Sequence, residues 1–210
     1  MLGANIRRGA AAGQREPDIP ELGRYRLRRT EDEVTSYIGM IIFLGSWAMM
    51  FAALFFAYAV VRVRAPIWPP PDQPALPLLV PGLNTVVISA SSAAVVLGVR
   101  AHARGGHRRA SLALGVGAGL GALFLALQAV VWAGVWRAGL VPSGGPYASV
   151  FYALTSFHAL HVLVGLAALA VLAIRSRARA ATRSAVRLWG MFWHFVGVVW
   201  GALYVAVYLA

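Results

Sequence analysis

The sequence predicts an all-α fold, an integral membrane bundle of five transmembrane helices. The chain is 60% hydrophobic and only 12% charged, which is far from the composition of a soluble domain. Five segments contain no Asp, Glu, Lys or Arg, and each is long enough for the roughly 20 apolar residues that cross a hydrocarbon core. These segments are 34–61, 73–99, 110–136, 138–174 and 188–210. A soluble bundle would have to bury five helices that are apolar on nearly every face, which a domain of this size cannot do.

The distribution of arginine predicts the orientation of the bundle. The chain has no lysine, so arginine supplies all the positive charge behind the formal net charge of +12. Sixteen arginines lie before the first segment, between the second and third, or between the fourth and fifth, and only Arg62, Arg64 and Arg137 lie on the other side. By the positive-inside rule, the N-terminus is cytoplasmic and the C-terminus extracytoplasmic. We attribute this charge to topology and anionic-lipid contacts, and not to nucleic-acid binding.

Two regions follow along the chain. Residues 1–33 are rich in Gly, Ala and Arg and hold every acidic residue except Asp72. We expect them to form a cytoplasmic tail that is mobile or bound to a partner. Residues 34–210 are the predicted membrane domain. Its spans are expected at about 36–62, 81–100, 110–136, 149–174 and 188–209.

The connections between spans also have interpretable sequences. Ala65–Pro81 is proline-rich and predicts a non-helical extracytoplasmic loop, in which Trp68 suits the membrane interface. The fourth span is expected after the turn Pro142–Pro146.

Within the third span, glycines alternate and predict close contact with another helix, because small residues let helices approach each other in a bilayer. They are Gly115, Gly117, Gly119 and Gly121.

Three histidines inside the spans are the strongest candidates for chemistry. His158 and His161 stand three residues apart in the fourth span, and His194 stands in the fifth. Ionisable groups at membrane depth point to function, and three imidazoles could hold a haem or copper. However, metal-bound imidazoles need acceptors to orient them, proton relays use carboxylates, and no Asp or Glu follows Asp72. The favoured interpretation is therefore neutral imidazoles that hydrogen-bond between helices. Cysteine is absent, so thiolate sites are excluded.

Several segments, in order, resemble a known family. They are IIFLGSWAMMFAALFFAYAVVR at 41–62, Trp68-Pro69, LNT at 83–85, SS at 91–92, LFLALQ at 123–128, FYALTSFHALHVLVG at 151–165 and MFWHFVGVVWGALYVAVYLA at 191–210. Together they cover the chain from about Ile38 onward. Any one of them is a weak signal, but the ordered set is specific. The chain resembles subunit III of the haem–copper respiratory oxidases, in the short, five-span bacterial form that lacks two leading helices of the seven-span version.

The resemblance implies a non-catalytic subunit in the bacterial cytoplasmic (inner) membrane. Such a subunit has no catalytic residue and binds no haem or copper itself, since these belong to partner subunits. Its expected partners are the catalytic subunit I, subunit II and membrane phospholipids. It supports the complex during oxygen reduction and proton translocation. The positions that match family motifs are expected to have structural, interhelical roles, and they are Asn84, Ser91, Ser92, Gln128, His158, His161, His194 and Trp200.

Three carboxylates that the family usually has inside the membrane are missing. Trp47 stands in place of a Glu in the first span, Val131 in place of a Glu in the third, and Gly197 in place of an Asp in the fifth. Family roles that depend on these acids, such as proton uptake, are therefore open for this chain. Three alternatives also remain at this point: an accessory subunit of a nitric-oxide reductase complex, a stand-alone transporter, and a haem-binding membrane anchor.

Overall fold

The computed structural model describes residues 19–68, 70–71 and 73–209, with side chains from Glu33 onward. These residues form five long α-helices and one short π-helix, and no strand. The elements are α1 (Ile19–Arg64), α2 (Leu79–Ala103), α3 (His107–Arg137), α4 (Pro146–Arg177), α5 (Arg183–Leu203) and η1 (Tyr204–Leu209). All five long helices are long and apolar enough to cross a membrane. The predicted five-span, all-α fold is confirmed, whereas the orientation of its termini stays a prediction.

The chain divides into two compact units, Met1–Ile38 and Gly39–Ala210. In the first unit, α1 already begins at Ile19, and Pro20 stands in its first turn, where a missing N–H is tolerated. The part of the predicted tail that the structure describes is therefore helical. The remainder of that tail lies outside the described residues, and its proposed mobility or partner binding stays a prediction.

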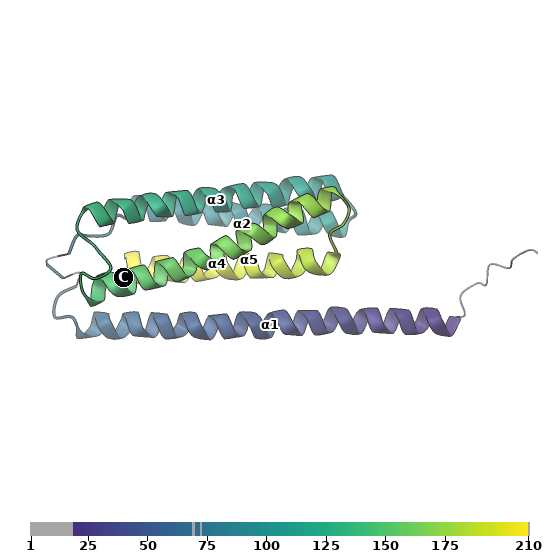
Figure 1. Cartoon of the computed structure of the whole chain (residues 1–210), viewed down its shortest axis with the longest axis horizontal. Coiled ribbons are helices and arrows are strands. Elements are labelled where there is room, and N and C mark those ends of the chain that lie inside the picture. The colour runs from purple at the N-terminus through teal and green to yellow at the C-terminus, as the bar shows by residue number, and fades with distance from the viewer. Residues whose placement is uncertain (1–18, 69, 72, 210) are drawn as a thin grey trace, which may run out of the picture. The chain divides into compact units, whose positions relative to one another are not determined.

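In the second unit, α2, α3, α4 and α5 form a closed ring of neighbours. α2 packs against α3 and α5, and α4 also packs against α3 and α5; the four helices run alongside one another in Figure 1. The turns at 104–106 and 178–182 are short, which places consecutive helices antiparallel and adjacent. The part of α1 from Gly39 on reaches this ring through large aromatic side chains, among them Phe43 and Phe51.

The proline-rich connection matches its prediction except at its end. Residues 65–68, 70–71 and 73–78 are not helical, but α2 begins at Leu79 and takes Pro81 into its first turn, where the helix needs no N–H from it. Trp68 packs edge-on against Tyr58 and Tyr147, with ring centroids 5.6 and 4.8 Å away. This loop is therefore anchored on the ends of α1 and α4.

The alternating glycines of α3 do not share one face. A Cβ at Gly117 would lie 2.8 Å from Val95 of α2, and one at Gly121 would lie 2.5 Å from Trp193 of α5. At Gly115 and Gly119 a Cβ would meet no described atom within 4 Å. Helical periodicity explains the difference, because residues four apart lie on the same face and residues two apart do not. Close helix contact is thus confirmed for two of the four glycines.

Candidate functional site

The indole of Trp193 is at the centre of the candidate site. Its side chain is fully buried and contacts each of the other helices of the ring. The six-membered ring lies against the backbone of Gly121 in α3 and of Gly165 in α4, where an added Cβ would come within 2.5 and 2.8 Å of it. Its Nε1–H donates to Ser91 Oγ of α2 at 3.0 Å, and that hydroxyl donates to the Gly117 carbonyl at 2.7 Å. One side chain therefore holds four helices together.

Trp200 repeats this arrangement two turns further along α5. It is also fully buried, and its Nε1–H donates to Thr85 Oγ1 of α2 at 3.0 Å. Close by in the sequence, Asn84 Nδ2 donates to Gln128 Oε1 of α3 in a long contact of 3.4 Å. The other polar atoms of that amide pair, Asn84 Oδ1 and Gln128 Nε2, are buried and have no hydrogen-bond partner among the described residues. These contacts give Asn84, Gln128 and Trp200 interhelical positions.

His158 contacts aromatic rings and makes no hydrogen bond. Its side chain is 1% exposed, and its ring centroid lies 5.8 Å from that of Phe124 and 5.5 Å from that of Trp200. Neither ring nitrogen has a partner among the described residues. The sequence led us to expect an interhelical hydrogen bond here, and that expectation is wrong for the residues that the structure describes. The imidazole instead fills space between α3, α4 and α5.

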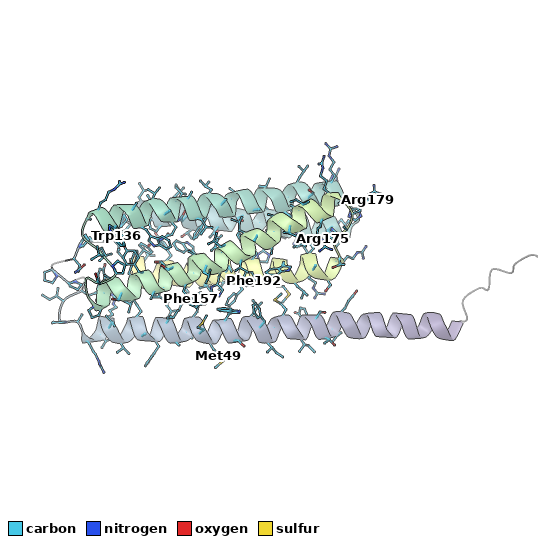
Figure 2. The ribbon with its side chains drawn as sticks, viewed as in Figure 1. Met49, Trp136, Phe157, Arg175, Arg179 and Phe192 are labelled. Atoms are coloured by element: carbon cyan, nitrogen blue, oxygen red, sulfur yellow. The ribbon has the colours of Figure 1, made fainter. Side chains whose placement is uncertain are left out.

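His161 also departs from that expectation. Its Nδ1 lies 2.6 Å from the Phe157 carbonyl, one turn earlier in the same helix, so this hydrogen bond stays within α4. The ring meets α1 through aromatic contacts: its centroid is 4.1 Å from that of Trp47 and 5.1 Å from that of Phe51. Figure 2 shows Phe157 on the side of α4 that faces α1. His161 is therefore part of an aromatic contact between two helices.

His194 lies apart from the other two histidines. It lines a shallow groove of about 200 Å³ between α2 and α5, with Val96, Val99, Arg100, Arg187, Gly190 and Met191. Among the described residues, no group of three or more His, Cys, Asp or Glu side chains could hold a metal ion. The three histidines that the sequence singled out thus occupy three different environments.

The positions of the missing carboxylates are each occupied by a group that suits an apolar interior. The Trp47 ring contacts His161, as described above, and Val131 is 3% exposed in the core. Gly197 of α5 faces α2, where an added Cβ would lie 3.3 Å from Ser92 Oγ. A buried carboxylate would need a hydrogen-bonding or charged partner. The sequence has no Asp or Glu between Glu33 and Asp72 or after Asp72, so the spans contain no carboxylate that would need one. An aromatic contact at Trp47, an apolar core side chain at Val131 and the absence of a side chain at Gly197 replace the three carboxylates.

Sequence reasoning missed the role of Trp193. It also missed the hydrogen bond that Trp132 Nε1–H of α3 donates to Thr155 Oγ1 of α4 at 3.1 Å. A signal for the first was available. Trp193 and Trp200 are seven residues apart, which places both on one face of a helix. The spacing of Gly117 and Gly121 pointed to a close approach on the facing helix.

Comparison with known proteins decides the family. The family model described as cytochrome c oxidase subunit III matches residues 28–210. This chain belongs to the cytochrome c oxidase subunit III family. The predicted resemblance is confirmed, and the protein is a subunit III of a respiratory oxidase and a multi-pass membrane protein.

Individual relatives agree with this assignment. The chain is 35% identical to cytochrome c oxidase subunit 3 of Synechocystis over 81% of its length and 74% of the relative's. It is 38% identical to the probable cytochrome c oxidase subunit 3 of Nocardia farcinica, over 81% of its own length and 86% of the relative's. The pig (Sus scrofa) subunit 3 is 34% identical, over 81% and 67% respectively.

Proposed function

We propose that this subunit III is a non-catalytic scaffold that binds the catalytic subunit I, together with subunit II, in a bacterial cytoplasmic membrane. In this role it holds no haem or copper itself and stabilises the complex while subunit I reduces oxygen and protons are translocated. The observation that carries the proposal is the family match over most of the chain. The interior of the ring supports it, because bulky side chains such as Trp193 and Trp200 fill the space between the helices.

The outer face of α1 suits a contact with lipid or with a partner subunit. Met49 is 77% exposed, and Phe56 and Val63 are 71% and 84% exposed; Figure 2 shows Met49 directed away from the other helices. In water, so large an apolar surface would be unfavourable. In a membrane, phospholipid or a neighbouring subunit covers it, and bound phospholipid is part of this proposal.

Co-purification tests the proposal directly. An affinity tag on the tail is expected to recover an oxygen-reducing, copper-containing subunit with its haem spectrum. Recovery of a haem and non-haem-iron subunit instead would favour the nitric-oxide reductase alternative. The chain purified alone is expected to have no Soret band and to be inactive in liposomes; a Soret band would support a haem-binding anchor, and solute flux would support a transporter.

The scaffold role makes a second, functional prediction. Complexes assembled without this subunit should start turnover at a normal rate and then lose activity faster than complete complexes. A complex that lacks the subunit and keeps its activity for as many turnovers as the complete enzyme would refute the stabilising role.

A further inference from the structure

Three polar side chains inside the ring have hydrogen-bonding groups that they do not use. Asn84 of α2 and Gln128 of α3 are 0% and 1% exposed, and Tyr208 of η1 is 7% exposed. The single bond between the two amides leaves Asn84 Oδ1 and Gln128 Nε2 without a partner among the described residues. The Tyr208 hydroxyl lies close enough to interact with the Gln128 side chain, but it is also buried without a hydrogen bond to a described residue. These three residues are called the amide–phenol cluster below.

Turning the amides over cannot satisfy the amide–phenol cluster. Each terminal amide has one oxygen that accepts and one NH2 group that donates. If either amide alone were rotated by 180°, two oxygens or two NH2 groups would face each other. If both were rotated, the same single bond would form in the opposite direction. Every orientation that keeps the bond therefore leaves one amide acceptor and one amide donor unused, in addition to the phenol hydroxyl.

The nearest hydroxyl in the sequence is already engaged. Thr85 Oγ1 donates to the Pro81 carbonyl at 3.0 Å and accepts the Trp200 Nε1–H at 3.0 Å. A lipid or a partner subunit cannot reach side chains that are buried within this one chain unless the ring opens. Buried polar groups in proteins are nearly always satisfied by protein or by ordered water. A molecule small enough to be enclosed by the ring is therefore the fitting partner.

We propose that the amide–phenol cluster holds one ordered water molecule that links α2, α3 and η1. A water molecule can accept a hydrogen bond from Gln128 Nε2, donate one to Asn84 Oδ1 and form a third with the Tyr208 hydroxyl. Three partners is the typical number for a buried water. A metal cation does not fit, because one of the three groups is an N–H donor and the sequence offers no Asp or Glu after Asp72.

The π-helical form of η1 agrees with this site. Tyr208 lies in the six-residue π-helix Tyr204–Leu209, which directly continues α5. Single π-helical turns are rare and often occur at functional sites. A water bond to the phenol would fix this turn against α2 and α3. The site lies within one chain, so this proposal does not depend on the proposed contact with subunit I.

A double-mutant cycle on the full-length chain tests for the bridge, with unfolding in mixed micelles as the readout. Tyr208→Phe should destabilise the chain, because the water loses a partner; removal of a hydroxyl that bonds to nothing would leave stability equal or higher. In an Asn84→Leu background, Tyr208→Phe should raise the unfolding equilibrium constant by a factor at least about threefold smaller than in the wild type. Such coupling needs a bridge, because Asn84 and Tyr208 share no direct hydrogen bond.

Tyr152→Phe is the matched control. It removes a phenol hydroxyl that donates directly to the Leu140 carbonyl at 2.7 Å, so its effect should add to that of Asn84→Leu. Gln128→Met distinguishes the water from a direct bond between phenol and amide. With the water, Tyr208→Phe is coupled to both amide variants, whereas with a direct bond it is coupled to Gln128→Met alone.

A structure of the assembled complex at a resolution that shows ordered water gives a second test, which needs no variant to fold. Density for one water within hydrogen-bonding distance of all three side chains is expected. The proposal is overturned if this density is missing, if Tyr208→Phe does not destabilise the chain, or if Tyr208 is coupled only to Gln128 or to neither amide.

Discussion

Replacing Gly121 with alanine should destabilise the bundle, whereas the same replacement at Gly119 should not. A Cβ at Gly121 would lie 2.5 Å from Cη2 and 2.8 Å from Cζ2 of Trp193. The indole cannot easily move away, because Gly165 packs on its other edge, where a Cβ would also lie 2.8 Å from the ring, and Ser91 accepts a hydrogen bond from its N–H. The new methyl group therefore forces apart elements that are already in contact.

The expected size of the effect follows from two opposing terms. Overpacking a filled core reduces the free energy of unfolding by about 1–3 kcal/mol. Alanine in place of glycine in a helix returns about 0.5–1 kcal/mol through lower chain entropy in the unfolded state. Gly121→Ala should therefore lose up to about 2.5 kcal/mol, with a central value of about 1 kcal/mol. At Gly119, where a Cβ meets no described atom within 4 Å, only the favourable term acts, and stability should stay equal or rise by up to about 1 kcal/mol.

Reversible unfolding in mixed micelles, with a denaturing detergent as titrant and tryptophan fluorescence as the signal, measures both variants. Adding Trp193→Phe makes the cause testable, because phenylalanine lacks the indole atoms that meet Gly121. The double variant Gly121→Ala/Trp193→Phe should be more stable than the two separate losses predict, by about 1 kcal/mol. If Gly121→Ala and Gly119→Ala agree within about 0.5 kcal/mol, or if the cycle is additive, the contact does not control stability.

Three further predictions concern the other tryptophans and the buried histidine. Trp200→Phe removes the hydrogen bond to Thr85 and should lower the free energy of unfolding by about 0.5–1.5 kcal/mol beyond the lost ring contacts; Thr85→Val should cost less in that background than in the wild type, as the same titration can measure. Trp47→Glu places a carboxylate among aromatic rings at a half-buried position beside His161 and should lower the midpoint of thermal unfolding, whereas Trp47→Phe should change it little. His158→Leu should leave the isolated chain as stable or more stable in the unfolding titration, because both ring nitrogens lack a partner among the described residues.

Each of these has an outcome that would contradict it. Additive losses at Trp200 and Thr85 would mean that the indole N–H bond contributes little. A Trp47→Glu chain as stable as the wild type would mean that the new acid finds a partner. A loss of more than about 1 kcal/mol in His158→Leu would mean that the ring makes a hydrogen bond in the membrane.

The spans and family motifs were readable from the sequence because each depends on local composition. A segment such as Ala110–Trp136 crosses the membrane whatever its neighbours are, since only a helix satisfies its backbone in a hydrocarbon core. The early start of α1 at Ile19 was harder to predict, because Pro20 reads equally well as a break or as a first-turn residue. The π-helix at the end of α5 had no recognisable signal.

The sequence by itself determined that this chain is a five-helix membrane protein of the subunit III family, without cysteine and without an acid after Asp72. Only the tertiary structure decided what the conspicuous polar residues do. His158 and His161 pack against rings instead of bonding across helices, while Trp193 of α5, which no motif argument singled out, contacts α2, α3 and α4 at once. Its neighbours are Ser91, Gly121 and Gly165, which lie far from it in the chain. Such contacts depend on which helix faces come together, and spacing within one segment cannot specify that.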